Sequence, residues 1–128
     1  MISHVMVGAI DLEASKKFYD AVLGAIGIPP GRVDKKGRVF YRTQTGLFGI
    51  TMPIDGAPAT HANGGTIGFN CDSPEVVKAF HGAGVANGGQ SIEDPPGWRD
   101  SSVGKFYLAY LRDPTGNKIC AITPSLIR

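Results

Sequence analysis

The sequence contains little of what several specialised protein classes depend on. Its 128 residues include only two cysteines, three histidines and one tryptophan, and the net charge is +2. Two cysteines without metal-type spacing give no sign of a disulfide framework and fit a reducing cytoplasm, where we expect the protein to reside. The N-terminal apolar run has no basic leader and is interrupted at Asp11, so neither a signal peptide nor a membrane partner is expected.

The weak positive charge also gives no reason to expect a nucleic-acid partner. The densest basic stretch, residues 32–38, is interrupted by Asp34 and Gly37, and we interpret it as a solvated turn. Eighteen glycines and nine prolines separate periodic apolar segments, which indicates tight connections rather than disorder. The length predicts one compact domain over residues 1–128.

What the sequence does contain is a near repeat of itself at an offset of 62 residues. The stretch 11–21 aligns with 73–83 without a gap. The identical pairs are Glu13/Glu75, Lys16/Lys78, Phe18/Phe80, Ala21/Ala83 and Gly27/Gly89. Two copies of one module share an interface, and in a chain of this size we expect a ligand cavity there.

Hydrophobic periodicity predicts the same element order in both copies. In the first module, residues 1–57, we expect a strand at 2–9, a helix from the Asp11 cap to 26, and strands at 31–35, 38–43 and 46–52. Residues 53–65 form the connector. In the second module, residues 64–124, we expect a strand at 66–71, a helix at 73–89, and strands at 90–94, 104–112 and 117–123. Ser73, Pro74 and Glu75 form a strong helix start.

These elements predict an α+β fold of two tandem βαβββ modules. The strands form a curled mixed sheet around a shared cavity, and the helices cover its outside.

Three stretches carry a resemblance to a known family. They are the opening Ile2-Ser-His4-Val, the helix region Asp11-Leu-Glu-Ala-Ser-Lys-Lys-Phe18-Tyr-Asp-Ala-Val-Leu-Gly24, and the turn Asp113-Pro114-Thr-Gly116-Asn117 inside Tyr110 to Ala121. Together with the repeat, they resemble the vicinal oxygen chelate superfamily, which includes glyoxalase I, the bleomycin-resistance proteins and the extradiol dioxygenases. The resemblance implies a small-molecule ligand and a homodimer.

The metal enzymes of that superfamily take one ligand, His or Glu, from each of four strands. The resemblance places these positions at His4, Gly49, Thr66 and Cys120. Three of the four have lost the usual donor, so it implies that no metal cofactor is bound in the usual way. The alternative is a rearranged zinc or nickel site of His4, His61 and Cys120 in a lactoylglutathione-lyase-like lyase or isomerase; whether the chain is an enzyme stays open.

Strand alternation assigns the remaining candidate residues. His4 and Met6 share one face, as do Thr66 and Gly68, and the glycines Gly49 and Gly68 leave room for a ligand. These residues and Cys120 are expected to line the cavity. Tyr107 and Tyr110 have opposite parity, so only one of them faces it; we include Tyr107 in the ligand-binding set and leave the choice open.

Two residues are candidate catalytic groups. His4 is either an acid or base or a hydrogen-bonded wall residue, and Cys120 is either an activated thiolate or an inert core residue. Trp98 and Arg99 lie on a Pro/Gly-rich segment, 94–100, that we expect to overhang the cavity. There Trp98 stacks on a planar ligand while Arg99 binds an anion, or Trp98 simply pins its own loop to the sheet.

Overall fold

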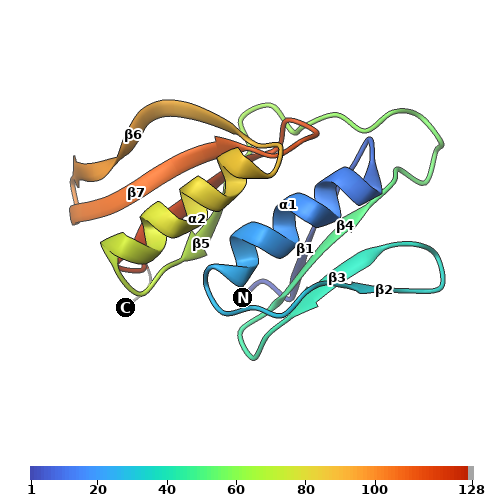
Figure 1. Ribbon diagram of the computed structural model, residues 1–128, viewed down its shortest axis with the longest axis horizontal. Helices are drawn as coiled ribbons and strands as arrows, with labels where there is room; N and C mark the ends of the chain where they lie inside the picture. The colour runs from blue at the N-terminus through green and yellow to red at the C-terminus, as the bar shows by residue number, and fades with distance from the viewer. Residues whose placement is uncertain (127–128) are drawn as a thin grey trace.

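The computed structural model describes residues 1–126, and the two last residues of the predicted domain, Ile127 and Arg128, lie outside them. The first module contains β1 (His4–Gly8), α1 (Leu12–Gly24), β2 (Arg32–Val33), β3 (Val39–Arg42) and β4 (Leu47–Thr51). The second contains β5 (Ile67–Asn70), α2 (Pro74–Ala86), β6 (Gln90–Ser101), β7 (Gly104–Arg112) and β8 (Lys118–Thr123). The predicted order of two tandem βαβββ modules is confirmed (Figure 1).

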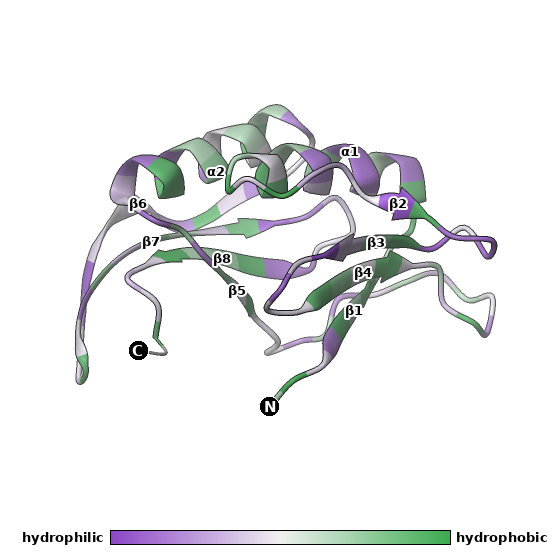
Figure 2. Cartoon of the chain, turned by 90° about the horizontal axis from the view of Figure 1, so that it is seen from below, coloured by the Kyte–Doolittle hydropathy of each residue, from purple (hydrophilic) through white to green (hydrophobic). Residues whose placement is uncertain are grey.

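The strands form two four-stranded sheets, β1-β4-β3-β2 and β5-β8-β7-β6, rather than one curled sheet. Each sheet is mixed, because β1 pairs in parallel with β4 and β5 with β8, while the other pairs are antiparallel. β1 and β5 are therefore edge strands at the same place in their modules. Figure 2 shows the two helices as one layer over the sheets, which agrees with the predicted position of the helices.

Both helices begin where the sequence predicts. The Asp11 carboxylate accepts a hydrogen bond from the N–H of Ala14 at 3.1 Å, and Ser73 Oγ accepts one from Val76 at 3.2 Å. These caps satisfy amides that have no partner inside the helix. α1 ends at Gly24, and Gly27 then takes a φ of +87°, a conformation that a side chain disfavours. The helix therefore ends here, and the chain continues to β2 at the edge of the same sheet.

The main core lies between the helix layer and the sheets. Phe18 and Phe80, equivalent residues of the repeat, are both fully buried. The two helices approach closely at Gly84, where an added Cβ would lie 2.6 Å from Leu111 Cδ1 and 3.1 Å from Phe18 Cε2. Packing between the helices therefore joins the two modules.

The second module differs from the prediction at β6. The sequence predicts a strand that stops near residue 94 and a loop over 94–100, but β6 continues to Ser101 and pairs with β7 throughout, apart from a bulge between Ile92 and Gly97. The bulge holds Pro95 and Pro96, which lack the N–H that regular pairing needs. An irregularity in the pairing thus allows the strand to pass two prolines.

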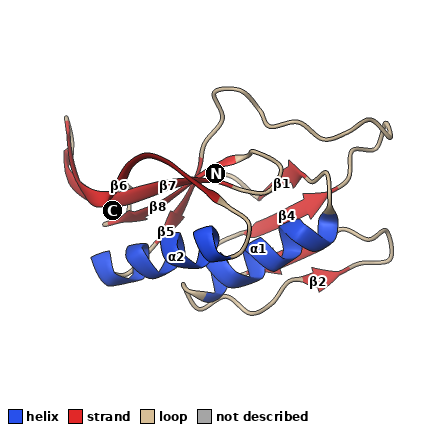
Figure 3. Cartoon of the chain, turned by 45° about the horizontal axis from the view of Figure 1, so that its top comes forward, coloured by secondary structure: helices blue, strands red, loops and turns tan. Residues whose placement is uncertain are grey.

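The connector between β4 and β5 is long and contains no helix or strand (Figure 3). Neither helix within residues 1–126 has the length and apolar character that crossing a bilayer requires.

Candidate functional site

A cavity of about 420 Å³ lies where the two modules meet, and we call it the seam cavity. It is lined by the first strand of each module, β1 and β5, and by the turn between β3 and β4. Leu23, Ile26 and Ile28 close one side, because they belong to the end of α1 and the turn that follows it. The volume is within the range of small-molecule sites, about 300–1,000 Å³.

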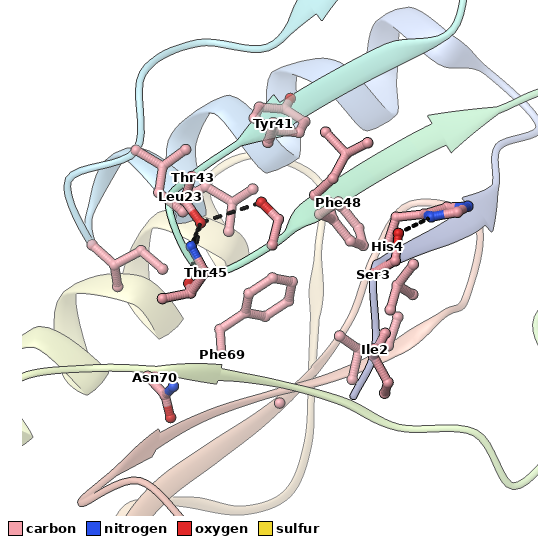
Figure 4. A pocket seen from close by; sticks show the side chains of 17 residues that line it. Ile2, Ser3, His4, Leu23, Tyr41, Thr43, Thr45, Phe48, Phe69 and Asn70 are labelled. Carbon is pink, nitrogen blue, oxygen red and sulfur yellow. Dashed lines mark hydrogen bonds between the residues drawn. The ribbon is translucent and has the colours of Figure 1, made fainter. Parts of the chain in front are cut away.

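Aromatic side chains from both modules form the wall of the seam cavity. Phe48 of β4 meets Phe69 of β5 edge to face, with ring centroids 5.4 Å apart (Figure 4). The ring centroids of Phe48 and Tyr19 lie 4.8 Å apart, and those of Phe69 and Phe80 lie 5.8 Å apart. This chain of rings ties the cavity wall to the core beneath both helices, so the wall is held rigidly.

Several exposed polar side chains lie at the rim of the seam cavity. Thr43 Oγ1 lies 3.2 Å from Thr45 Oγ1, and it also accepts a hydrogen bond from the Thr45 N–H (Figure 4). The side-chain amide of Asn70 has no hydrogen-bond partner within residues 1–126, so it is available to a ligand. None of the described residues that line the cavity is Lys, Arg, Asp or Glu.

Tyr41 is a buried residue in the wall of the seam cavity, and its hydroxyl belongs to a polar network. Its hydroxyl donates to Asp20 Oδ1 at 2.8 Å, and Asp20 also accepts from the Gly31 N–H at 2.9 Å and from Lys16 Nζ at 2.7 Å. Burial, and then the Asp20 carboxylate, raise the pKa of Tyr41. Burial by itself would raise the pKa of Asp20, but its hydrogen bonds to Gly31, Lys16 and Tyr41 lower it overall. Tyr41 therefore stays protonated and Asp20 ionised, which fixes this wall.

The seam cavity is lined from both faces of its edge strands, and His4 and Gly68 lie on the expected face. Val5, Phe48 and Phe69, which line it, have the parity that packs toward the helices. The cavity exists there because α1 ends before it covers the junction of the sheets. The signal in the sequence was the early stop at Gly24 to Pro30, which marks where the helix no longer covers the sheet.

His4 and Gly68 are the expected cavity residues that reach the seam cavity. The His4 Nδ1 atom is 2.8 Å from Ser3 Oγ, and its exposed ring points away from Phe69 in Figure 4. A Cβ added at Gly68 would have no other atom within 4 Å, so space is open beside it. Thr66 precedes β5 and is exposed.

Gly49 does not leave room for a ligand, contrary to expectation. A Cβ at this position would lie 2.5 Å from Met6 Sδ and 3.0 Å from Phe40 Cδ1, so these two side chains already fill the space. Met6 and Gly49 are direct neighbours in the register of β1 and β4. Met6 thus packs over Gly49 and is not part of the seam cavity.

Cys120 is an inert core residue in this structure, the second of the two alternatives. It is only 5% exposed and packs with Phe106, Leu108 and Ile122 in a small cluster on the face away from the helices. Burial raises the pKa of the Cys120 thiol to about 11. A thiol with this pKa is neutral at pH 7 and is therefore a poor nucleophile.

The residues do not fit the metal site of the resemblance or the rearranged one. Gly49 has no donor atom, and His61 lies in the connector against Gly116, within 3.5 Å of the position a Cβ would take there. Among residues 1–126, no three His, Cys, Asp or Glu side chains are placed to hold one ion. His4, His61 and Cys120 therefore do not form a site within the chain.

Tyr107 faces the helices and not the cavity, which corrects the expected set. It is 7% exposed and belongs to the core, whereas Tyr110 packs on the opposite face beside Cys120. Trp98 lies directly across from Tyr107, so both share a face, and their rings meet edge to face at 5.4 Å. Trp98 thus packs on its own sheet, although 59% of it stays exposed.

Arg99 forms hydrogen bonds within its own strand. Its Nη2 atom donates to the carbonyl oxygens of Asp94 and Pro95, both at 3.0 Å, and this closes the β6 bulge. Segment 94–100 is therefore part of a hairpin strand and does not overhang the seam cavity.

The comparisons with known proteins agree with this architecture. The family described as Glyoxalase/Bleomycin resistance protein/Dioxygenase superfamily matches residues 1–121. A glyoxalase/bleomycin resistance protein from Albidiferax ferrireducens is 66% identical, with a TM-score of 0.92, over 95% of this chain and 98% of that one. No curated protein matches.

More distant structures share the fold. A glyoxalase/bleomycin resistance protein/dioxygenase family enzyme from Burkholderia phytofirmans is 18% identical with a TM-score of 0.71, over 94% of this chain and 95% of that one. A lactoylglutathione lyase from Agrobacterium tumefaciens is 20% identical with a TM-score of 0.65, over 95% of this chain and 92% of that one. The family match and the 66% identity establish that this chain belongs to the glyoxalase/bleomycin resistance protein/dioxygenase superfamily.

Proposed function

We propose that this protein binds a small, mostly apolar organic molecule in the seam cavity and does so without a divalent metal. The observation that carries the proposal is the cavity itself, about 420 Å³ of space between the two modules with a wall of Phe48 and Phe69. A ligand that fills this space removes apolar surface from water on both sides, and each Å² contributes about 25 cal/mol.

The lining indicates which ligand fits. Without Lys, Arg, Asp or Glu among its described lining residues, the cavity has nothing to neutralise a charged ligand, and burying an unpaired charge is costly. The hydroxyls of Thr43 and Thr45 and the amide of Asn70 offer hydrogen bonds at the rim. A neutral ligand with a flat apolar body and one or two polar groups satisfies both features.

Independence from metal is supported by the chemistry of the donor positions. Gly49 offers no side chain, and the Cys120 thiol is neutral and packed among apolar groups. No catalytic step is assigned. The lining contains one hydroxyl beside an imidazole, Ser3 Oγ and His4 Nδ1 at 2.8 Å, but both residues are exposed, and no further hydrogen bond within residues 1–126 orients the His4 ring. We also propose that the protein is a homodimer, which light scattering on the purified chain tests directly.

A neutral fluorescent probe tests ligand binding. N-phenyl-1-naphthylamine is apolar and uncharged, and we expect it to bind with a stoichiometry of one per chain. Thr45→Trp places a bulky ring at the rim of the cavity, and it is expected to weaken binding about tenfold or more because the probe and the ring compete for one space. Thr60→Trp is the matched control, since Thr60 is an exposed connector residue that does not line the cavity.

Metal dependence is tested on the same protein. We expect EDTA to leave probe binding unchanged, and elemental analysis of protein prepared without chelators to find less than about one tenth of an ion per chain. Loss of binding in EDTA with recovery on adding Ni²⁺ or Zn²⁺ would contradict metal independence. Equal binding by Thr45→Trp and Thr60→Trp would contradict the location of the site.

A further inference from the structure

Three arginines lie on the same face as one aromatic residue, Phe40, near the outer edge of the first sheet. Arg32 of β2 lies directly across from Phe40 of β3, and Arg42 is two residues further along β3. Side chains two apart in a strand share a face, so Arg32, Phe40 and Arg42 lie on the side opposite the buried Val39 and Tyr41. Arg38 has the same parity, and its guanidinium lies 5.2 Å from the centre of the Phe40 ring.

The short β2 leaves a groove beside these residues. β2 has only two residues, so the pairing with β3 stops at Phe40, and the edge of β3 is open at Tyr41 and Arg42. A groove of about 550 Å³ lies there, with Pro29, Pro30 and Val33 as apolar walls and with Arg32, Phe40 and Arg42 in its lining.

The charge in the groove is not balanced. Arg38 is paired with Asp34, with Nη2–Oδ2 at 2.6 Å and Nε–Oδ2 at 2.7 Å, and Asp34 is the only carboxylate among the described residues that line the groove. The guanidinium groups of Arg32 and Arg42, both exposed residues, have neither an ion pair nor a hydrogen-bond partner within residues 1–126. Asp20, behind Tyr41, is already bound by Lys16. Two guanidinium groups therefore remain available to an anion.

We propose that this groove binds an organic carboxylate with a flat apolar body. The carboxylate lies between Arg32 and Arg42, because a guanidinium donates two parallel hydrogen bonds to such a group. The apolar body lies along Pro29, Pro30 and the exposed part of Phe40. This site is separate from the seam cavity, whose described lining residues include no arginine. Ile28 and Tyr41 are the two residues that line both spaces.

Titration of the full chain with 2-naphthoate tests the proposal, with 2-naphthamide as the uncharged probe of the same shape. We expect Arg32→Gln and Arg42→Gln each to weaken the binding of 2-naphthoate about tenfold. We also expect 2-naphthamide to bind the wild-type protein no more tightly than 2-naphthoate binds either variant. Lys35→Gln is the matched control: Lys35 is exposed in the same basic stretch, its replacement removes the same charge, and it does not line the groove. It is expected to change binding less than about twofold.

Three results would overturn the anion site. One is an equal loss in Lys35→Gln, which would show attraction by net charge alone. Another is competition by inorganic phosphate at the same concentration as naphthoate, which would show that the apolar body is not recognised. The third is loss of naphthoate binding in Thr45→Trp with binding kept in the arginine variants, which would place the probe in the seam cavity. Binding of N-phenyl-1-naphthylamine to Arg42→Gln reports on the seam cavity separately, so failure of one site does not imply failure of the other.

Discussion

The two modules share one plan but differ in how their helices are held. Tyr19 of α1 and His81 of α2 are equivalent in the repeat. Tyr19 is fully buried, and its hydroxyl donates to Asp113 Oδ2 of the other module at 2.6 Å. His81 is half-buried, and its Nε2 atom lies 2.9 Å from Ser91 Oγ within its own module. The first helix is therefore bound across the interface by a polar contact that the second lacks.

The Asp113 carboxylate is the centre of that contact. Its Oδ1 accepts the N–H groups of Thr115 and Asn117 at 2.9 Å each, and its Oδ2 accepts the Asn117 side chain at 2.9 Å. The Asn117 amide also donates to the carbonyl oxygen of Gly8 in β1 at 3.0 Å. Burial, and then the carboxylate, raise the pKa of Tyr19, so the phenol stays a donor. The β7–β8 turn thus joins the second module to both α1 and β1.

The largest effect is expected from removing this carboxylate. Asp113→Ala leaves Tyr19, Asn117 and two backbone N–H groups without their buried acceptor, and we expect a loss of about 3–5 kcal/mol in the free energy of unfolding. Urea denaturation followed by circular dichroism measures it. Asp100→Ala is the control, because the exposed Asp100 is 4.0 Å from Lys105 and a surface pair contributes less than about 1 kcal/mol. Similar losses in both variants would show that Asp113 does not join the modules.

A second difference lies at the contact between the helices. Gly84 of α2 is equivalent to Val22 of α1, and a Cβ at Gly84 would be 3.2 Å from Val22 Cγ1 as well as close to Leu111 and Phe18. We expect Gly84→Ala to cost about 1–2 kcal/mol, because the added methyl must displace packed side chains.

Gly82, two residues before Gly84 in the same helix, is the matched control. A Cβ there meets no atom within 4 Å, and Gly82→Ala is expected to stabilise the protein by about 0.5–1 kcal/mol through helix propensity. Thermal unfolding of both variants measures the difference. A stabilised Gly84→Ala protein would show that the helices have room to separate.

Much of this architecture follows from local signals in the sequence. Asp11, Ser73 and Pro74 mark the helix starts because capping depends on neighbouring residues only. The repeat predicts two equal modules because it preserves the buried Phe18 and Phe80. The extent of β6 was missed, because Pro95 and Pro96 indicate a loop unless a bulge accommodates them, and the bulge depends on pairing with β7.

The candidate site was less predictable for a related reason. Alternation separates the two faces of a strand, but it does not show where a helix stops covering one of them, so the part that Val5, Phe48 and Phe69 play in the seam cavity was not predicted. Tyr107 and Tyr110 could not be assigned without the core that Tyr107 joins. The sequence placed Arg32 in a solvated turn and Arg42 in a separate strand. Their proximity depends on the register of β2 on β3, which sets Arg32 opposite Phe40, and the sequence does not show this register.

The smallest expected effect concerns a polar network that, within residues 1–126, has no equivalent in the second module. Asp20 of α1 is equivalent to Gly82 of α2, and it holds Tyr41, Gly31 and Lys16. The pKa of Asp20 is lower in the folded protein than its ordinary value of 3.8. The ionised carboxylate therefore stabilises the folded state above about pH 4, and this contribution is lost as the pH falls through the lower folded pKa.

We expect Asp20→Asn to be less stable than the wild type by about 0.5–1 kcal/mol at pH 7, with the difference disappearing toward pH 2. Urea denaturation of both proteins between these pH values measures the two curves. The amide can still accept a hydrogen bond from Gly31 or Tyr41, so the variant removes the charge with little change in shape. Parallel curves would mean that the Asp20 charge adds nothing, and that the wall of the seam cavity depends on the Tyr41 ring and its packing alone.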